Sequence, residues 1–336
     1  MKRKITVIAL ICALSIPSFG QNIDLGNVQD VIDDFSVGLA GTLPFTSAIG
    51  LNWSDAHVGN FPNLGVGVAL GATSMALPGN VSIGSILGAF NVSNPLDNLP
   101  FKVKSGMLLP AYVIEARVGG FVLPFDVGVK FGIIPDLGTY TNGKISLDYL
   151  LLGANIRYAI LKNDFILPTL SVGLGFNYLK GGIGTSIGST QTVDLPNSGG
   201  SITIDQPKVG LEWETKSIDA TVQLSKSLLI ITPYLGFGAN YAFSKAGYAV
   251  KATVSGLDAA EKDALEKIGI DIDDAGFSSI QGQKGLSYRL FGGISLNLAL
   301  LRFDITAMYS LGNNLKNVST TLDNNFGLTF GIRLQI

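Results

Sequence analysis

The chain has little of what enzymes use for nucleophilic catalysis or proteins use for covalent cross-linking. Among its 336 residues there is one cysteine, Cys12, and one histidine, His57. A single cysteine excludes an internal disulfide, and no Cys/His cluster has the spacing of a zinc site. His57 stands beside Ser54, Asp55 and Asn60 in a segment typical of a polar turn. We therefore expect no enzymatic activity, no cofactor and no metal site.

Charge is also scarce, and no long apolar run follows the first twenty residues. Charged residues make up 14% of the chain and the formal net charge is -2, which excludes a basic surface for nucleic acid. No later stretch reaches about eighteen consecutive apolar residues, the length of a membrane helix. Yet the mean hydropathy is +0.39. High hydropathy without a candidate membrane helix is typical of a β-barrel, whose lipid-facing residues alternate with lumen-facing ones.

The N-terminus has the pattern of a secretory signal peptide. A positive segment at 2–4 precedes an apolar run at 5–16, and Ser18 and Gly20 supply the small residues before a cleavage site. The predicted organisation has three parts. These are a signal peptide (1–20), an N-terminal amphipathic segment in the lumen or at the periplasmic mouth (21–44), and the barrel (45–336).

Repeated alternation of apolar with small or polar residues predicts membrane strands. In 326–336, FGLTFGIRLQI, every second side chain is apolar and would share one face of a strand. The same pattern recurs at 64–72, 111–118, 125–133, 150–160, 165–187, 203–224, 235–243, 288–298 and 303–311, and more weakly at 45–54. We predict an all-β fold, a closed antiparallel transmembrane β-barrel whose first and last strands pair, because no sheet edge stays open in lipid.

The strand number follows from the rule that single-chain bacterial barrels have even counts. Eleven runs are counted, so twelve strands are predicted, with 36–43 or a hairpin within 80–108 as the twelfth; ten and fourteen are the alternatives. Within 203–224 the apolar face changes parity. Either a bulge near 215–217 or a change of environment above the membrane explains it.

The connections alternate in length. Short turns fall near 121, 163, 228 and 300, and long connections at 134–144, 185–207, 248–285 and 312–325. Outer-membrane barrels have short periplasmic turns and longer extracellular loops, so the C-terminus is predicted in the periplasm of a bacterial outer membrane.

A short amphipathic helix is predicted at 24–35, ahead of the barrel. Val28, Val31, Ile32 and Phe35 share its apolar side. Three placements stay open: a hatch in the lumen, a cap at the periplasmic mouth, or a mobile tether without function.

Strand parity places charges of both signs in the lumen. Six lie near the short turns or the C-terminus and would form a belt at the periplasmic end: Arg117, Asp126, Arg157, Arg302, Asp304 and Arg333. Others on this face are Glu115, Lys130, Asp219 and Arg289. The belt is either a selectivity constriction or gate, or a paired network that fills a narrow barrel. Many lumen positions are glycine, which either lets a segment approach the wall or permits curvature.

The long connection at 248–285 has signals of its own helix. Asp258 and Glu261 have capping-box spacing and Gly269 stands at a stop position, predicting a helix at 258–268. The acidic run at 271–274 lacks the spacing of a calcium-binding loop.

These features resemble Gram-negative outer-membrane β-barrel proteins. The resemblance rests on the signal MKRKITVIALICALSIPSFG, the repeated hairpins and the end FGLTFGIRLQI, although Ile336 stands where an aromatic residue is usual. It implies insertion by the barrel-assembly machinery and contact with outer-membrane lipid. The N-terminal segment and long strands look like the FadL family of fatty acid transporters, which implies passage of a small hydrophobic solute through a plugged lumen. An open porin and a closed structural or surface-interaction barrel are the alternatives.

Overall fold

The computed structural model describes a barrel with an internal N-terminal helix. Its described residues are 25–53, 63–75, 107–120, 124–134, 145–161, 167–186, 190–194, 201–204, 208–251, 254–255, 276–315 and 325–336. Several predictions fall outside these residues: the signal peptide, the turn with His57, the loop helix at 258–268 and the acidic run at 271–274. The hairpin suggested for 80–108 also lies outside them, apart from its last residues, which belong to a barrel strand.

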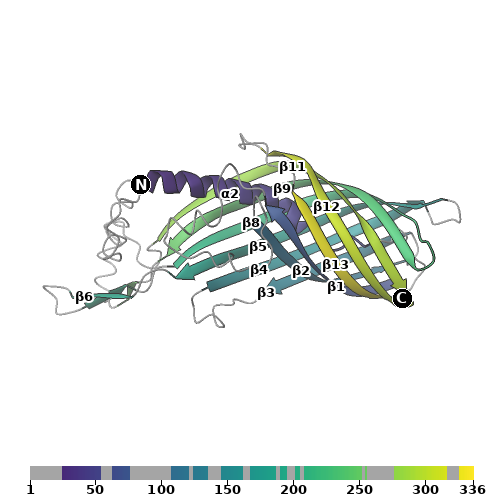
Figure 1. Ribbon diagram of the computed structural model, residues 1–336, viewed down its shortest axis with the longest axis horizontal. Helices are drawn as coiled ribbons and strands as arrows, with labels where there is room; N and C mark the ends of the chain where they lie inside the picture. Colours follow the sequence, from purple (N-terminus) through teal and green to yellow (C-terminus); the bar gives the residue numbers. More distant parts are fainter. Residues whose placement is uncertain are drawn as a thin grey trace.

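Ten antiparallel strands close into one barrel. They are β1 (Asn63–Met75), β2 (Met107–Gly119), β3 (Phe125–Ile134), β4 (Ile145–Leu161), β5 (Thr169–Ser186), β8 (Lys208–Ser225), β9 (Ile231–Lys251), β11 (Gly276–Leu298), β12 (Leu301–Leu315) and β13 (Phe326–Gln335). The barrel closes by pairing β1 with β13, as predicted (Figure 1). Three short strands, β6 (Gln191–Asp194), β7 (Ser201–Ile204) and β10 (Val254–Ser255), form a separate sheet.

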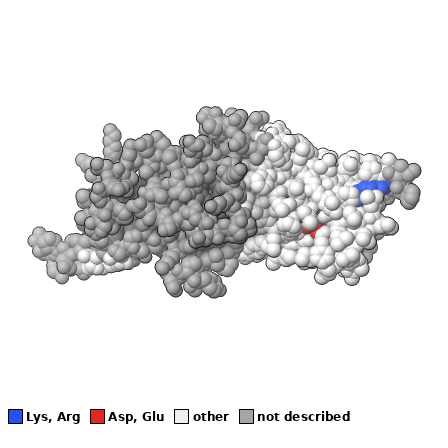
Figure 2. Space-filling view, in the orientation of Figure 1, with Lys and Arg blue, Asp and Glu red and all other residues white. Residues whose placement is uncertain are grey.

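The outer surface of the barrel is apolar along its strands. Val68, Ile294 and Phe330 are 47%, 54% and 54% exposed, and their neighbours on each strand point inward. Figure 2 shows one side of the molecule, where most of the described surface is uncharged. An apolar exterior around a closed barrel is stable in lipid and unstable in water, so the strands form a transmembrane barrel.

The predicted count of twelve strands is wrong, and the alternative of ten is the one observed. Both 36–43 and the start of 45–54 belong to one helix, α2 (Leu25–Ser47), which is longer than the predicted 24–35. The segment lies inside the barrel, where no free strand edge is available to pair with it. A helix satisfies its own backbone hydrogen bonds there, whereas an isolated strand would not.

Hydroxyl side chains stabilise the last turns of α2. Thr42 Oγ1 donates to the carbonyl of Gly38 at 3.1 Å, and Ser47 Oγ donates to the carbonyl of Pro44 at 2.8 Å. These bonds use the O–H donors of the two buried hydroxyl groups within the helix, and the same oxygens also contact Asn325 and Ser217 of the barrel. Among the described residues, no helix is long and apolar enough to cross a membrane.

One side of the barrel is taller than the other. The strands β5, β8, β9 and β11 have 18 to 23 residues, whereas β1, β2, β3 and β13 have 10 to 13. The helix α2 packs mainly against β8, β9 and β11 (Figure 1). The pairing of β8 with both neighbours is unbroken through 215–217, so the suggested bulge is wrong. From 211 to 225 its odd-numbered residues face inward, and what changes is the environment of the even-numbered face.

The membrane assignment predicts a depth-dependent penalty for charge on the outer wall. Val68 lies in mid-strand between Ile114 and Ile332, whereas Leu64 on the same face lies at the short-turn end. Val68→Lys should lower the free energy of unfolding by about 2–4 kcal/mol, and Leu64→Lys by about 0–1 kcal/mol. Denaturant titration of protein folded into phospholipid vesicles measures both. Equal penalties at the two positions would contradict a lipid-facing wall.

Candidate functional site

The chain after α2 runs down the inside of the barrel as an irregular segment. We call residues 47–53 the plug segment. Thr42 Oγ1 accepts a hydrogen bond from Asn325, just before the first residue of β13, at the long-connection end. At the other extreme, the carbonyl of Trp53 accepts a bond from Gln223 Nε2 at 2.6 Å, close to the short turn after β8. The chain from Thr42 to Trp53 therefore runs through the lumen from the long-connection end towards the short-turn end.

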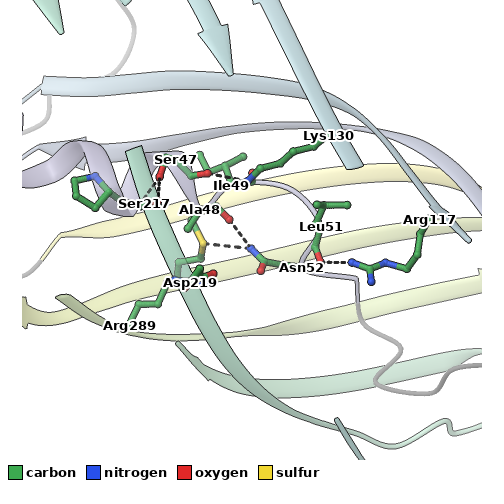
Figure 3. A network of polar contacts seen from close by, with 12 residues as sticks. Ser47, Ala48, Ile49, Leu51, Asn52, Arg117, Lys130, Ser217, Asp219 and Arg289 are labelled. Carbon is green, nitrogen blue, oxygen red and sulfur yellow. Dashed lines mark hydrogen bonds and ion pairs between the residues drawn. The ribbon is translucent and has the colours of Figure 1, made fainter. Parts of the chain in front are cut away.

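Two buried charges hold the backbone of the plug segment. Glu115 of β2 accepts hydrogen bonds from the N–H of Leu51 at 2.6 Å and from Trp53 Nε1 at 2.5 Å. Lys130 of β3 donates to the carbonyls of Ser47 at 2.7 Å and Ile49 at 2.6 Å (Figure 3). We call Glu115 and Lys130 the latch. Each is only 4% exposed, so these bonds replace the water that a buried charge requires.

The backbone conformation of the plug segment turns its polar groups towards the latch. Gly50 has a φ of 83° and Leu51 has a φ of 58°. The left-handed conformation is common for glycine but uncommon for leucine. The hydrogen bond from the N–H of Leu51 to Glu115 and the full burial of its surroundings hold it in place.

Trp53 forms the lower end of the plug segment. The guanidinium groups of Arg117 and Arg333 lie over its ring, at 5.3 and 4.6 Å from the centroid. Arg117 also donates to the carbonyl of Leu51 at 3.2 Å (Figure 3). Two arginines that strand parity places in the lumen therefore both contact the plug segment.

The six residues of the predicted charge belt all face the lumen, in separate groups on the wall. Asp126 pairs with Arg117 and with Arg157, the latter at 2.6 Å. Asp304 pairs with Arg333 at 3.4 Å, and Arg302 donates to Asn297 at 3.4 Å. A gating role for these residues stays a prediction. A further buried pair joins Arg289 to Asp219 through two bonds of 2.7 and 2.6 Å.

Glycines on the lumen face leave room for the plug. A Cβ atom added to Gly128 would lie 2.9 Å from Leu51 Cδ2 and 2.9 Å from Arg117 Nη2. One added to Gly65 would collide with the ring of Trp53. At these two positions the close approach of a second segment accounts for glycine, which is one of the two explanations that the sequence left open.

Above the latch, the buried side chains of the described lumen carry no charge, and many of them form an apolar cluster. We call this the apolar layer, and its buried members include Leu39, Leu43, Phe45, Leu109, Val113, Tyr149, Leu151, Leu179, Trp213, Ala246 and Tyr248. Leu151 and Leu179 pair across β4 and β5, and Trp213 pairs with Ala246 across β8 and β9. Buried polar residues such as Thr215 and Ser244, whose hydroxyl oxygens are 2.7 Å apart, lie among them. The described lumen therefore has an uncharged, largely apolar half near the long connections and a charged half near the short turns.

The space left beside the plug segment is small. A cavity of about 20 Å³ lies between Asn52, Lys130, Asn155 and Asp219. This volume holds about one water molecule, and its lining is polar. In the described residues no three His, Cys, Asp or Glu side chains are grouped as metal ligands. Around the latch, this cavity is the space that the described plug segment and wall leave beside Asn52.

The sequence interpretation missed the plug segment and therefore its latch. Strand alternation at 45–54 concealed it, although Leu39 with Leu43 and Thr42 with Thr46 repeat at helical spacing and favour a longer helix. The predicted hatch residues Val28, Val31, Ile32 and Phe35 lie on α2, but the structure does not describe their side chains.

Comparison with known proteins finds distant likenesses only. No protein-family model and no curated protein sequence matches the chain. Similar solved structures include the outer membrane protease OmpT of Escherichia coli, with 9% identity, coverage of 83% of this chain and 98% of that chain, and a TM-score of 0.40. Neisserial surface protein A has 13% identity, coverage of 82% of this chain and 97% of that chain, and a TM-score of 0.28. A FadL homologue of Pseudomonas aeruginosa has 9% identity, coverage of 82% of this chain and 90% of that chain, and a TM-score of 0.20. The chain is similar to bacterial outer-membrane β-barrels, and at this distance the likenesses assign no function.

The latch can be tested through Trp53. The chain has two tryptophans, so after Trp213→Phe the tryptophan fluorescence comes from Trp53 of the plug segment alone. In that background, Glu115→Gln should increase acrylamide quenching of Trp53 and lower the free energy of unfolding by about 1.5–3 kcal/mol, because two bonds to a charged acceptor are weakened. The control is Glu212→Gln on the exposed outer face of β8. Unchanged quenching after Glu115→Gln would show that the carboxylate does not hold the plug.

Proposed function

We propose that the protein carries a small hydrophobic solute across the outer membrane, through a lumen that the plug segment closes. The observation that supports this proposal is the division of the lumen into an apolar layer and a charged layer. Solute would enter from the long-connection end, which the alternating connection lengths favour as the extracellular side. It would bind in the apolar layer and leave when the plug segment moves.

The apolar layer suits a hydrophobic solute because leucine and aromatic side chains line it. Leu179 and Trp213 project inward from the tall strands β5 and β8 and Leu151 from the neighbouring β4, and all three belong to the buried cluster that includes Leu43 of α2. Displacing an apolar helix side chain such as Leu43 by an apolar solute exchanges one buried contact for another. Burial yields roughly 25 cal/mol per Å² of apolar surface in either case, so the exchange is close to neutral. An ion or a polar solute would instead leave its hydration shell without compensation.

The hydrogen bonds of the charged layer suit a plug segment that moves to open the lumen. The bonds of Glu115 and Lys130 to the plug backbone are strong while water is excluded. When water enters, both partners regain hydrogen bonds to solvent, so the net cost of release is about 0.5–3 kcal/mol per bond. A solute that binds better to the open state than to the closed state supplies that energy. An open porin fits less well, because the lumen at this level has room for about one water molecule.

A closed structural barrel is the second candidate, and the filled lumen favours it. The ion pairs of Asp126 and Asp219 lie on the wall and stabilise the barrel whether or not the plug moves. In that case the working surfaces would be the loops at the long-connection end. The two candidates differ in one property, the mobility of residues 47–53.

A reversible cross-link tests the proposal directly. Ser47 Oγ and Ser217 Oγ are 3.4 Å apart, so Ser47→Cys with Ser217→Cys places two thiols within reach of a disulfide. Uptake of a fluorescent long-chain fatty acid is measured in host cells that lack another such channel. We expect the oxidised variant to block uptake and reduction with dithiothreitol to restore it, because the cross-link fixes the plug to β8.

The single variant Ser47→Cys is the matched control and should behave the same in both redox states. Binding is followed separately in Trp53→Phe protein, where a brominated fatty acid should quench Trp213 in the apolar layer. Quenching with equal uptake in the oxidised and reduced double variant would contradict a moving plug. Absence of both quenching and uptake would instead favour the closed structural barrel.

A further inference from the structure

The outer wall of β5, β8, β9 and β11 carries a cluster of four lysines at one edge of the apolar surface. Cross-strand pairing aligns its outward residues in rows. One row contains Tyr178, Lys216, Phe243 and Lys284, and the next contains Lys180, Glu214, Lys245 and Gly282. Directly paired residues of an antiparallel sheet lie on the same face, so these eight positions form one patch.

The patch lies at the boundary of the lipid-facing surface. The row on its other side, towards the short turns, is Phe176, Ile218, Tyr241 and Leu286. These are apolar or aromatic and each is at least 40% exposed. Rings of aromatic residues flank the apolar band of a membrane barrel at the level of the lipid headgroups. The lysines begin at that level, on the half of the barrel that bears the long connections.

The lysines surround a hollow rather than a flat surface. A depression of about 460 Å³ is lined by Glu214, Lys216, Phe243, Lys245, Gly282 and Lys284. A Cβ atom added to Gly282 would meet nothing within 4 Å, so the missing side chain opens the hollow. The side chains of Lys216 and Lys245 are 59% and 57% exposed. A group the size of a phosphate can approach their ammonium groups.

The charge of the patch is positive after its internal pairs are counted. Glu214 pairs with Lys216 at 3.2 Å and with Lys245 at 2.9 Å, which holds two lysines at the edge of the hollow. Lys216 also lies 5.7 Å from the ring centre of Tyr178. Even with Glu212 one row further out, the four lysines outnumber the two carboxylates. Lysine is a common ligand of phosphate groups.

We propose that this hollow binds a phosphate group on the headgroup of a lipid in the surrounding leaflet. The lysines would contact the phosphate, while Phe243 and Tyr241, 5.3 Å apart between ring centres, pack against the upper part of the acyl chains. The site is independent of the lumen and of solute passage. It would fix a lipid on the tall side of the barrel, where α2 packs inside.

The probe for this site is lipid A that carries two phosphate groups, added to the full chain in detergent micelles. Native mass spectrometry counts the bound lipid. The triple variant Lys216→Gln, Lys245→Gln and Lys284→Gln should bind about tenfold or more weakly than the unsubstituted protein. Lys226→Gln, at the short-turn end, is the matched control and should not change binding. Lipid A without phosphates should bind the unsubstituted protein as weakly as the triple variant binds the phosphorylated form.

A second variant keeps every charge. Gly282→Leu fills the hollow from an open position and should also weaken binding, which keeps the test decisive if the triple variant does not fold. Equal binding by the triple variant and the unsubstituted protein would overturn the proposal. Displacement of lipid A by an equal concentration of inorganic phosphate would overturn it as well, because the site would then bind free anions rather than a lipid.

Discussion

The lumen of this barrel contains charged side chains that need partners, and this requirement organises the rest of the structure. Glu115 and Lys130 project inward from neighbouring strands, and both side chains are buried against the plug segment. A buried charge without hydrogen bonds would cost several kcal/mol. The plug segment supplies those bonds from its backbone. In return, the carbonyls of Ser47 and Ile49 and the N–H group of Leu51 gain hydrogen-bond partners on the barrel wall. The wall and the plug therefore stabilise each other.

The same interaction explains why the lumen has two layers. Hydrogen bonding to main-chain groups suits the level where the helix has ended and carbonyl and N–H groups are free. Higher up, α2 satisfies its own backbone and presents side chains such as Leu39 and Leu43, so the wall opposite is apolar. The change from helix to irregular backbone after Ser47 coincides with the change from apolar to charged lining. The proposed solute site in the apolar layer thus lies directly above the plug segment, which continues the chain of α2.

The periodicity of the sequence was enough to predict the wall. Lipid-facing and lumen-facing residues alternate along the strands, so strand positions and the lumen placement of Arg117 or Asp304 followed from parity. The pairing of the first and last strands followed from the need to leave no open sheet edge in lipid. The strand count was wrong because one segment with alternating apolar residues lies inside the barrel. Alternation alone does not show whether a segment is part of the wall or is enclosed by it. Residues 45–53 are the example. Their environment is decided by the closed sheet around them.

The latch was beyond sequence reasoning for a different physical reason. Glu115 and Lys130 were placed in the lumen by parity, but their partners are backbone atoms of Ser47, Ile49 and Leu51, which no side-chain pattern identifies. The lysine patch on the outer wall likewise depends on register. Lys216, Lys245 and Lys284 are far apart in the chain, and only the pairing of β8, β9 and β11 brings them around Gly282.

The central claim is that the plug segment, held by the latch, closes the barrel. The measurement that tests it most directly is single-channel conductance in planar bilayers, for the intact protein and for protein that lacks residues 25–53. The claim predicts no steady current from the intact protein and a steady current after the deletion, because the glycine-lined wall then encloses water. The same current from both proteins would show that another part of the chain sets the permeability, and would contradict the claim.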